Sequence, residues 1–330
     1  MYKNLTIAAV VPCYNEQSQI ESVIDSMPPV VDIILVVDDK SRDNTVDLVM
    51  NHSCYGSRLQ LIRHVINQGV GGAIASGYKW CRDHEIGIAV VMAGDGQMNP
   101  DDLVSILDPV ADSTADYTKG NRLVIGNSFR KIPKTRFIGN VILSFLTKIA
   151  SGYWNLSDSQ TGYTAINANA LNLINWDRMY KRYGQPNDLL VKLNVADMVV
   201  VDVPMMPVYD VGEVSGIKLT QVIPRISLLL IRLFIWRVKE KYVIRGLHPL
   251  IFFYLMSLVS ITLSCLFLIR LVFLYAYTSA FPEVSFLIVL FTLAVSINSA
   301  LFAMWFDYQE NIHLNPRTPY STLRRYFKNQ

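Results

Sequence analysis

The stretch GIAVVMAGDGQ (87–97) joins an apolar run to an acidic, glycine-rich end. The apolar run is typical of a strand that is buried on both faces, as in a parallel sheet. Gly-Asp-Gly is common in turns, so the simplest interpretation of Asp95 is a turn residue. The alternative is that Asp95 lies at the carboxyl edge of an open α/β sheet, where such proteins bind ligands. The segments around it favour the second interpretation.

Three other apolar runs precede this one, and each ends in a polar loop. They are LTIAAVVP (5–12), DIILVVDD (32–39) and RLQLIRH (58–64). Helix-like segments lie between the runs, at 16–27, 41–52 and 70–84. The alternation of strands and helices predicts an α/β domain with a mainly parallel, Rossmann-like sheet.

Acidic residues follow three of the predicted strands and should gather at one edge of the sheet. They are Glu16, Asp38, Asp39 and Asp95. Like charges in a cleft repel one another, so this edge calls for a cation or for hydrogen-bond donors from a ligand. A few carboxylates whose cation shell is completed by phosphates are typical of Mg²⁺. We therefore expect a metal and diphosphate site here.

Other catalytic motifs fit the sequence poorly. NQGVGGAIASG (67–77) matches GxGxxG only loosely, because Ile74 stands at the third glycine position. The sequence contains no P-loop and no GxSxG motif, and we identify no convincing Ser/His/Asp set. The net charge of +3 does not suggest nucleic-acid binding. The four cysteines show no CxxC spacing, which favours a reducing compartment, and we expect no signal peptide.

Two C-terminal segments are apolar enough to cross a membrane. Residues 250–277 contain one charge, Arg270, and residues 284–306 contain none. The second segment would be about 35 Å long as a helix, against a hydrocarbon core of about 30 Å. Basic residues flank the pair on both sides, among them Arg237 before it and Arg324 after it, whereas the connection TSAFPE (278–283) has none. By the positive-inside rule we expect an integral membrane protein with two spans, its N-terminal domain and both termini being cytoplasmic.

The run 222–242 mixes basic and apolar residues, which predicts a helix lying in the membrane interface. The alternative is an ordinary amphipathic helix packed on the soluble domain. The expected organisation has four parts: a cytoplasmic catalytic domain at 1–210, interfacial amphipathic helices at 211–248, a transmembrane hairpin at 249–306 and a cytoplasmic tail at 307–330.

With these segments in order, the chain resembles glycosyltransferase family 2, and within it the polyprenyl-phosphate glycosyltransferases such as dolichol-phosphate mannose synthase. The resemblance covers about 180 residues. Its motifs are PCYNE (12–16), VVDDKSRDNT (36–45), NQGVGGAIASGY (67–78), AGDGQ (93–97), GNRL (120–123), SDSQTGY (157–163) and PNDLL (186–190). It implies the A-type glycosyltransferase fold, a nucleotide-sugar donor, a polyprenyl-phosphate acceptor and a role in cell-envelope glycan synthesis.

The resemblance also implies roles for individual residues. The nucleoside would be contacted by Pro12, Tyr14, Glu16 and Asp39. Asp95 and Gln97 match the second Asp and the Gln of the family's DxDxQ motif, where Mg²⁺ or Mn²⁺ and the diphosphate bind, and Arg122 matches an arginine that contacts the donor.

On the acceptor side, Asp158 matches an acid beside the reacting centre, and Asp188 matches an acid of the acceptor-side helix. The loop 121–136 carries five basic residues. Arg136 fits the arginine expected to hold the lipid phosphate, and Arg130 lies in the same loop.

The chain departs from the family pattern at three places. Ala93 stands where DxDxQ has its first Asp, so one metal ligand is missing. Val70 replaces a lysine common in NxGKG, and a downstream arginine before Gly-x-Ser-Lys has no clear counterpart, with Lys218 a possible substitute.

The implied reaction is inverting transfer of a sugar from a UDP- or GDP-linked donor to undecaprenyl or dolichyl phosphate. One alternative is a membrane-bound synthase that extends a polysaccharide, although two spans and no QxxRW motif speak against it. Another is a non-catalytic membrane adaptor, which Ala93 keeps open. The sugar, the base, the lipid length and any homo-oligomer are not fixed by the sequence.

Overall fold

The computed structural model describes residues 1–123, 134–205 and 219–316, with side chains throughout except at 134–138, 140 and 219–223. The chain divides into two compact units, residues 1–234 with 312–330, and residues 235–311. The four-part organisation expected from the sequence stays a prediction. The division falls inside one continuous helix, α9 (Leu219–Lys239). It does so because the first half of α9 packs on the first unit. Residues 312–316, which follow the second unit, belong to the first, where Asn315 Oδ1 accepts from Asn155 N–H at 2.7 Å.

The first unit contains a seven-stranded sheet in the order β3-β2-β1-β4-β6-β5-β7. Its strands are β1 (Ile7–Cys13), β2 (Ile33–Asp38), β3 (Leu59–Arg63), β4 (Ile88–Val91), β5 (Tyr117–Asn121), β6 (Thr164–Asn167) and β7 (Val200–Pro204). Every neighbouring pair is parallel except those that involve β6, which runs antiparallel to β4 and β5. The predicted mainly parallel α/β fold is confirmed.

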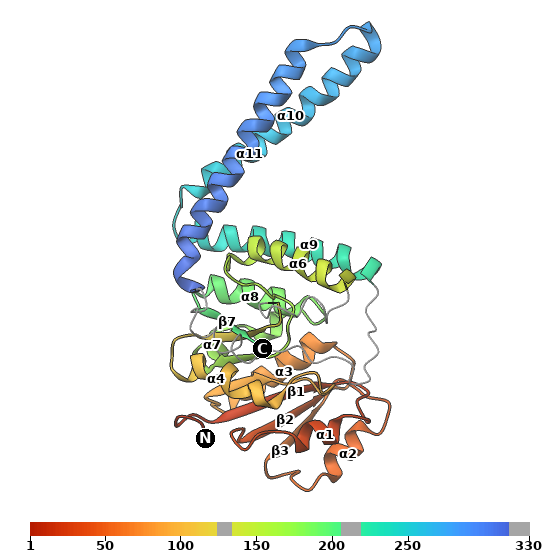
Figure 1. The fold of residues 1–330 in the computed structure, drawn as a ribbon, viewed down its shortest axis with the longest axis vertical. Helices are drawn as coiled ribbons and strands as arrows, with labels where there is room; N and C mark the ends of the chain where they lie inside the picture. Colours follow the sequence, from red (N-terminus) through yellow and green to blue (C-terminus); the bar gives the residue numbers. More distant parts are fainter. Residues whose placement is uncertain (124–133, 206–218, 317–330) are drawn as a thin grey trace. The chain divides into compact units, whose positions relative to one another are not determined.

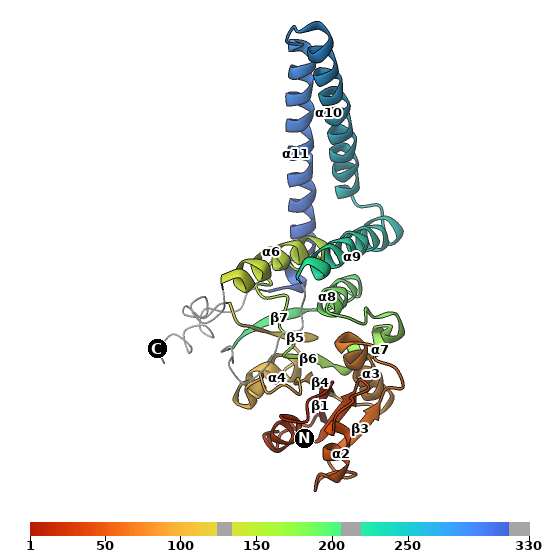
Figure 2. The same ribbon diagram turned by 90° about the vertical axis from the view of Figure 1, so that its right-hand side faces the viewer.

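Helices cover both faces of this sheet. On one face lie α1 (Ile20–Asp25), α2 (Thr45–Asn51) and α4 (Leu103–Ala111), and on the other lie α3 (Val70–Asp83), α7 (Ala168–Leu173) and α8 (Gln185–Val195). Successive side chains of a strand point to opposite faces, so β1 sends Ile7, Ala9 and Val11 to the first layer and Ala8 and Val10 to the second. Figure 2 shows α4 on one side of the sheet and α3 and α7 on the other.

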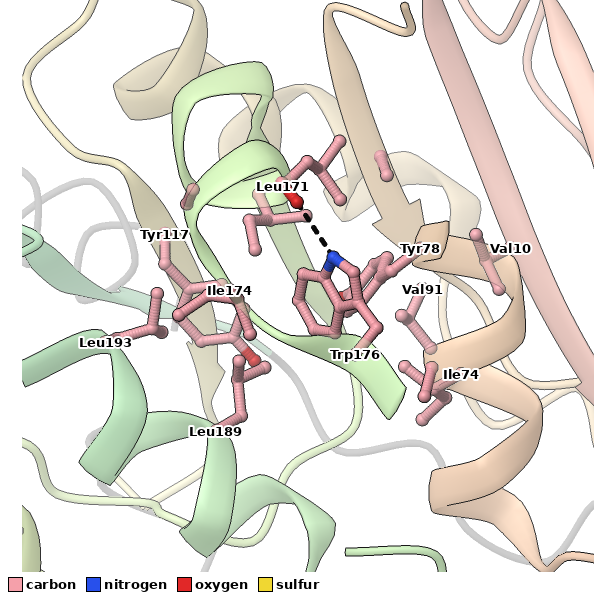
Figure 3. Close-up of a cluster of buried hydrophobic side chains, with 14 of the residues drawn as sticks. Val10, Ile74, Tyr78, Val91, Tyr117, Leu171, Ile174, Trp176, Leu189 and Leu193 are labelled. Atoms are coloured by element: carbon pink, nitrogen blue, oxygen red, sulfur yellow. Dashed lines mark hydrogen bonds between the residues drawn. The ribbon is translucent and has the colours of Figure 1, made fainter. Parts of the chain in front are cut away.

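Trp176 anchors the second layer. It lies in the short 3-10 helix η2 (Trp176–Arg178) and packs against Tyr78 of α3, with 4.9 Å between ring centroids. Its Nε1 donates to the carbonyl oxygen of Leu171 at 2.8 Å, so the polar atom of the buried indole is satisfied (Figure 3). The contact joins α3 to α7 over the sheet.

Two amphipathic helices extend this layer. One is α6 (Lys134–Ser151) and the other is the first part of α9. They pack on α8 through a small cluster formed by Ala150, Val191, Ile226, Leu230 and Leu233. The predicted interfacial helix therefore packs on the domain with one face, as the alternative interpretation expected.

Both helices also expose apolar side chains. On α9, Leu228 is 51% exposed and Ile231 is 57% exposed. On α6, the exposed set comprises Val141, Ile142, Phe145 and Leu146. The sequence does not mark α6 as an apolar surface, because its polar and apolar residues alternate without a marked break in composition.

The second unit is built around two antiparallel helices, α10 (Leu250–Thr278) and α11 (Glu283–Asn311), which lie side by side (Figure 1). In each, an 18-residue stretch has a mean hydropathy of 2.3, and both helices are long enough to cross a membrane. Small polar residues lie between them: Ser296 Oγ donates to the Ser257 carbonyl oxygen at 3.0 Å. The outward side chains are largely apolar and exposed, as membrane-facing residues are.

Arg237 corrects one expectation. It was counted among the basic residues flanking the hairpin, but its side chain is fully buried. Its two terminal nitrogens donate to the two carboxylate oxygens of Asp307 at 2.7 and 3.0 Å, and Tyr242 donates to the same carboxylate at 2.7 Å. Asn311 completes the cluster by donating to the Tyr242 hydroxyl at 2.7 Å. The helix α11 continues to Asn311, past the predicted end of the hairpin at 306, and so supplies these partners.

We expect Asp307→Ala to destabilise the second unit by about 3–5 kcal/mol, because it leaves the Arg237 charge buried without a partner. Thermal unfolding in detergent measures the loss. Replacing both partners, Arg237→Met with Asp307→Leu, should recover much of it, whereas Arg232→Ala, at an exposed arginine of the same helix, should change little. Equal stability of Asp307→Ala and Arg232→Ala would contradict the assignment.

Candidate functional site

The strand order predicts a ligand crevice between β1 and β4. From β1 the chain continues to β2 on one side and later returns to β4 on the other, so the loops after β1 and β4 diverge. The turn after β4 lies against the end of β1, where Gly94 N–H donates to the Pro12 carbonyl oxygen at 3.4 Å. A side chain at Gly94 would bring its Cβ within 3.3 Å of the Cys13 Cβ. A side chain would fit there only if its neighbours shifted by a few tenths of an ångström.

The loops after β1 and β2 are tied to each other. Asn15 N–H donates to Ser41 Oγ at 2.9 Å, and Glu16 N–H donates to Thr45 Oγ1 at 2.9 Å. In return, Arg42 N–H donates to Asn15 Oδ1 at 2.8 Å. The loop that carries the predicted nucleoside contacts is therefore fixed by backbone hydrogen bonds.

The predicted nucleoside contacts differ in exposure. Pro12 is buried within β1, whereas Tyr14 is 42% exposed at the mouth of the crevice. Tyr14 and Glu16 therefore lie where a base could stack or hydrogen-bond, and their roles stay predictions.

Asp39 holds the loop before α3. Its Oδ1 accepts from Gln68 N–H at 2.7 Å and contacts His64 Nδ1 at 2.7 Å, and its Oδ2 accepts from Gly69 N–H at 2.6 Å. His64 Nε2 in turn contacts Ser76 Oγ at 2.9 Å. The structure thus brings together a Ser/His/Asp set that sequence spacing did not reveal. Because its carboxylate also accepts two backbone N–H groups, the set acts as a structural tie that shapes the NQG loop.

Asp95 lies in the turn after β4 with one oxygen engaged. Its Oδ1 accepts from Gln97 N–H at 3.1 Å. Burial raises the pKa of the Asp95 carboxyl, so an approaching cation would stabilise its ionised form. The Gln97 Nε2 atom is buried and has no hydrogen-bond partner among the described residues. An acceptor on a ligand would satisfy the Gln97 amide nitrogen, and a cation or a donor would satisfy the Asp95 carboxylate.

The expected cluster of four carboxylates does not form. Among the described residues, no three His, Cys, Asp or Glu side chains are placed to hold a metal together. Asp38 instead accepts from Ser41 N–H at 3.2 Å, and Asp39 holds the NQG loop. The acids at the strand ends are drawn to nearby backbone N–H groups, which sequence order alone does not reveal. Asp95 and Gln97 stay the predicted metal ligands.

Arg122 follows β5, which runs parallel to β4 with β6 between them, so it lies at the same sheet edge as Asp95. Its Nε and Nη2 donate to the two oxygens of Asp158 at 2.7 and 3.2 Å. Asp158 is fully buried, which by itself would raise the pKa of its carboxyl, but the Arg122 charge and hydrogen bonds lower that pKa overall. Asp158 is therefore ionised and holds the guanidinium in place.

Asp188 lies in the first turn of α8 and is nearly buried. Its Oδ2 accepts from Tyr180 N–H at 2.7 Å and from Lys192 Nζ at 2.7 Å. These contacts tie the start of α8 to the preceding loop. The acceptor-side role expected for Asp188 stays a prediction.

Asn187, beside it, was not singled out by the sequence analysis. It is fully buried, and its Oδ1 accepts from Thr147 Oγ1 at 2.9 Å and from Gln160 Nε2 at 3.0 Å. Its Nδ2 has no partner among the described residues. Its position in the PNDLL motif was the available signal.

Three residues singled out by the resemblance fall wholly or partly outside the described residues. Arg130 lies outside the described residues, and so does Lys218. Arg136 lies in α6, but its side chain is outside the described part.

Residues 8–174 match the model of glycosyl transferase family 2. The chain belongs to this family. The resemblance inferred from the ordered motifs is confirmed.

Similar proteins of the family act on polyprenyl phosphates. The chain is 30% identical over 216 residues to a UDP-N-acetylglucosamine–dolichyl-phosphate N-acetylglucosaminyltransferase of Methanococcus voltae, covering 62% of this chain and 86% of that one. It is 28% identical over 204 residues to an undecaprenyl-phosphate mannosyltransferase of Micrococcus luteus, covering 61% and 83%. The predicted group within the family, the polyprenyl-phosphate glycosyltransferases, is supported by both.

Among solved structures, the chain resembles glucosyl-3-phosphoglycerate synthase of Mycobacterium tuberculosis in complex with Mn²⁺, UDP and glucosyl-3-phosphoglycerate. The TM-score is 0.52 at 20% identity, over 71% of this chain and 80% of that one. This similarity confirms the A-type fold.

We expect Asp39→Asn to destabilise the first unit by about 1–3 kcal/mol, because the introduced amide cannot accept from all three donors that now meet the carboxylate. Chemical denaturation measures the loss. Asp177→Asn is the matched control, since its carboxylate pairs with Lys79 on the surface and such pairs contribute about 0–1 kcal/mol. A loss no larger than that of the control would show that Asp39 does not hold the NQG loop.

Proposed function

We propose that this protein transfers a sugar, with inversion, from a UDP- or GDP-linked donor to a polyprenyl phosphate at the cytoplasmic membrane face. Support comes from the relatives, one of which is named for a UDP-linked donor and a dolichyl-phosphate acceptor. The observation that carries the proposal is Asp95 with Gln97 at the β1/β4 crevice of a family 2 fold. The family habit of single displacement is the basis for inversion.

The donor set at this turn fits a hard divalent cation. Asp95 offers a carboxylate whose pKa is raised by burial. Gln97 offers an amide oxygen that could ligate the cation, and its buried, unsatisfied nitrogen could donate to a diphosphate oxygen. One carboxylate and one amide oxygen leave most of an octahedral shell to water and diphosphate oxygens, which is the coordination that Mg²⁺ prefers. Because Ala93 stands where the family has its first Asp, these other ligands have to complete the shell. Bound there, Mg²⁺ or Mn²⁺ would neutralise charge on the leaving diphosphate.

The protein's own cation at this edge is Arg122. A guanidinium fixed in place before the reaction stabilises charge that develops on the departing diphosphate without reorganising. Asp158 supplies this fixation through two hydrogen bonds. Because Asp158 is ionised and fully engaged, we assign it to positioning Arg122; contact with the reacting centre is not needed for this role.

The acceptor needs little activation. The second pKa of a phosphate monoester is about 6, so a lipid phosphate is largely ionised at neutral pH. A strong general base is therefore unnecessary, which agrees with the structural engagement of Asp158 and Asp188. Arg130 and Arg136 are proposed to bind the lipid phosphate.

The membrane would present this lipid beside the domain. The apolar faces of α6 and α9 are proposed to lie in the interface, with α10 and α11 spanning the bilayer. Both termini and the catalytic domain would be cytoplasmic, since the TSAFPE connection lacks the basic residues found on the other side.

We expect Asp95→Asn to abolish both sugar transfer and the gain in UDP or GDP affinity that Mn²⁺ confers, because the amide cannot supply an anionic ligand. Calorimetric titration with and without Mn²⁺ measures the second effect independently of turnover. Asp101→Asn, at an exposed acid a few residues along the same segment, should behave as wild type. Metal-dependent binding that persists in Asp95→Asn would refute the site.

The acceptor is tested with radiolabelled donors and undecaprenyl or dolichyl phosphate in detergent. We expect a chloroform-soluble product whose anomeric configuration, read by NMR, is inverted relative to the donor. A polymeric product would favour a polysaccharide synthase. Retention of configuration would contradict single displacement, and absence of turnover with every donor would favour the non-catalytic adaptor.

A further inference from the structure

The loop SDSQT (157–161), which carries Asp158, is held by buried polar groups of four elements. Ser159 N–H donates to Ser144 Oγ of α6 at 3.1 Å, and Gln160 Nε2 donates to Asn187 Oδ1 of α8 at 3.0 Å. The remaining two elements are β5 and β7, which lie next to each other in the sheet (Figure 2). A loop held at this many points is a rigid support for Asp158.

Asp202 of β7 provides one of these contacts and links it to Arg122. Its Oδ2 accepts from Ser157 N–H at 2.8 Å and from Asn121 Nδ2 at 2.7 Å. Ser157 immediately precedes Asp158, and Asn121 immediately precedes Arg122. One buried carboxylate therefore holds the residues before both members of the Arg122–Asp158 pair.

Lys119 of β5 holds the other end of the loop. It is the register partner of Asp202 in the sheet, and its Nζ donates to the carbonyl oxygen of Thr161. Both side chains are buried: burial raises the pKa of Asp202 to about 7 and lowers the pKa of Lys119 to about 8, against the raising effect of Asp158 and Asp202 on Lys119. Burying these two groups is costly, so a purely apolar strand pair would be the more stable choice here.

We propose that Asp202 is a positioning residue that, together with Lys119, holds Arg122 and Asp158 in the geometry in which Arg122 meets the donor diphosphate. The inference rests on the proposed function, because it assigns Arg122 to the donor. Asp202 acts through Asn121 and Ser157, and the proposal needs no contact between Asp202 and the substrate.

Two variants of Asp202 differ in whether they keep its hydrogen bonds from Ser157 and Asn121. Asp202→Ala removes the acceptor, so Ser157 and Asn121 lose their common anchor. Asp202→Asn keeps an oxygen that accepts both bonds, and a carboxyl with a pKa near 7 is already partly protonated at neutral pH. The amide should therefore rescue the function that alanine removes.

Asp116, the residue immediately before β5, offers a matched control. Its carboxylate accepts from Asn167 Nδ2 and from Val199 N–H, both at 2.8 Å. It thus holds one asparagine and one backbone N–H, as Asp202 does, but it precedes β5 at the opposite edge of the sheet. Asp116→Ala measures the stability lost when such an anchor is removed, while the surroundings of Arg122 stay unchanged.

The experiment measures steady-state kinetics with varied donor, thermal unfolding and hydrogen exchange of the full-length protein in detergent. Asp202→Ala should lower kcat/KM for the donor about 10²-fold, the size expected for a misplaced catalytic group. The KM for lipid phosphate should be unchanged. Asp202→Asn should come within about threefold of wild type, since the hydrogen bonds survive. Exchange should rise in the peptide that covers 157–161.

Asp116→Ala should lose thermal stability but keep donor kinetics and exchange at 157–161. Equal kinetics for Asp202→Ala and Asp116→Ala would overturn the proposal, and so would a failure of Asp202→Asn to rescue. If Asp202→Ala does not fold, Asn121→Ala takes its place and should show the same loss for the donor. Normal donor kinetics in that variant would overturn the proposal as well.

Failure of the proposed function gives a different pattern. Suppose that the wild type transfers no sugar, but Asp202→Ala still raises hydrogen exchange at 157–161. This result would contradict the proposed reaction and the donor-positioning role, whereas the anchoring of the loop by Asp202 would stand. Active wild type with unchanged exchange in Asp202→Ala would overturn this inference alone.

Discussion

The crevice between the carboxyl ends of β1 and β4 is the constraint on which the site depends. It arises because the chain builds the sheet outward from β1 in both directions, and so the loops after these two strands diverge. Gly94 brings the AGDGQ turn against the end of β1, and β5 delivers Arg122 to the same edge. The antiparallel strand β6 adds the loop before it, with Asp158, to this edge.

Buried charges then fix the loops that the crevice brings together. Asp39 holds the NQG loop, Asp158 holds Arg122, and Asp202 holds the residues before both members of that pair. Each carboxylate accepts at least two hydrogen bonds, so the cost of burying it is offset by satisfied donors. The same principle operates in the second unit, where Arg237 and Asp307 join α9 to the end of α11. A rigid electrostatic site is the consequence, and it suits a reaction in which charge moves onto a leaving diphosphate.

The sequence predicted the parallel sheet, the family and the two long apolar helices, because strand runs, ordered motifs and hydropathy are local signals. It did not predict which acids are already engaged. Asp38 and Asp39 were expected to gather with Asp95 at an edge that calls for a cation or for ligand donors, but they accept from backbone N–H groups of nearby loops. Arg237 was expected near the lipid head groups. Its partner Asp307 lies 70 residues away in the sequence, so no local pattern indicates the pair. Asn187 and Asp202 were missed for the same reason: their neighbours come from other strands and helices.

The central claim is that Asp95 holds a divalent cation against the donor diphosphate. A crystal structure of the protein with UDP or GDP and Mn²⁺, with an anomalous difference map to locate the metal, tests it most directly. We expect an anomalous peak about 2.0–2.2 Å from an Asp95 carboxylate oxygen and from diphosphate oxygens, the distance typical of a hard cation with oxygen ligands. Bound nucleotide with the Asp95 side chain turned away from the metal and the diphosphate would contradict the claim.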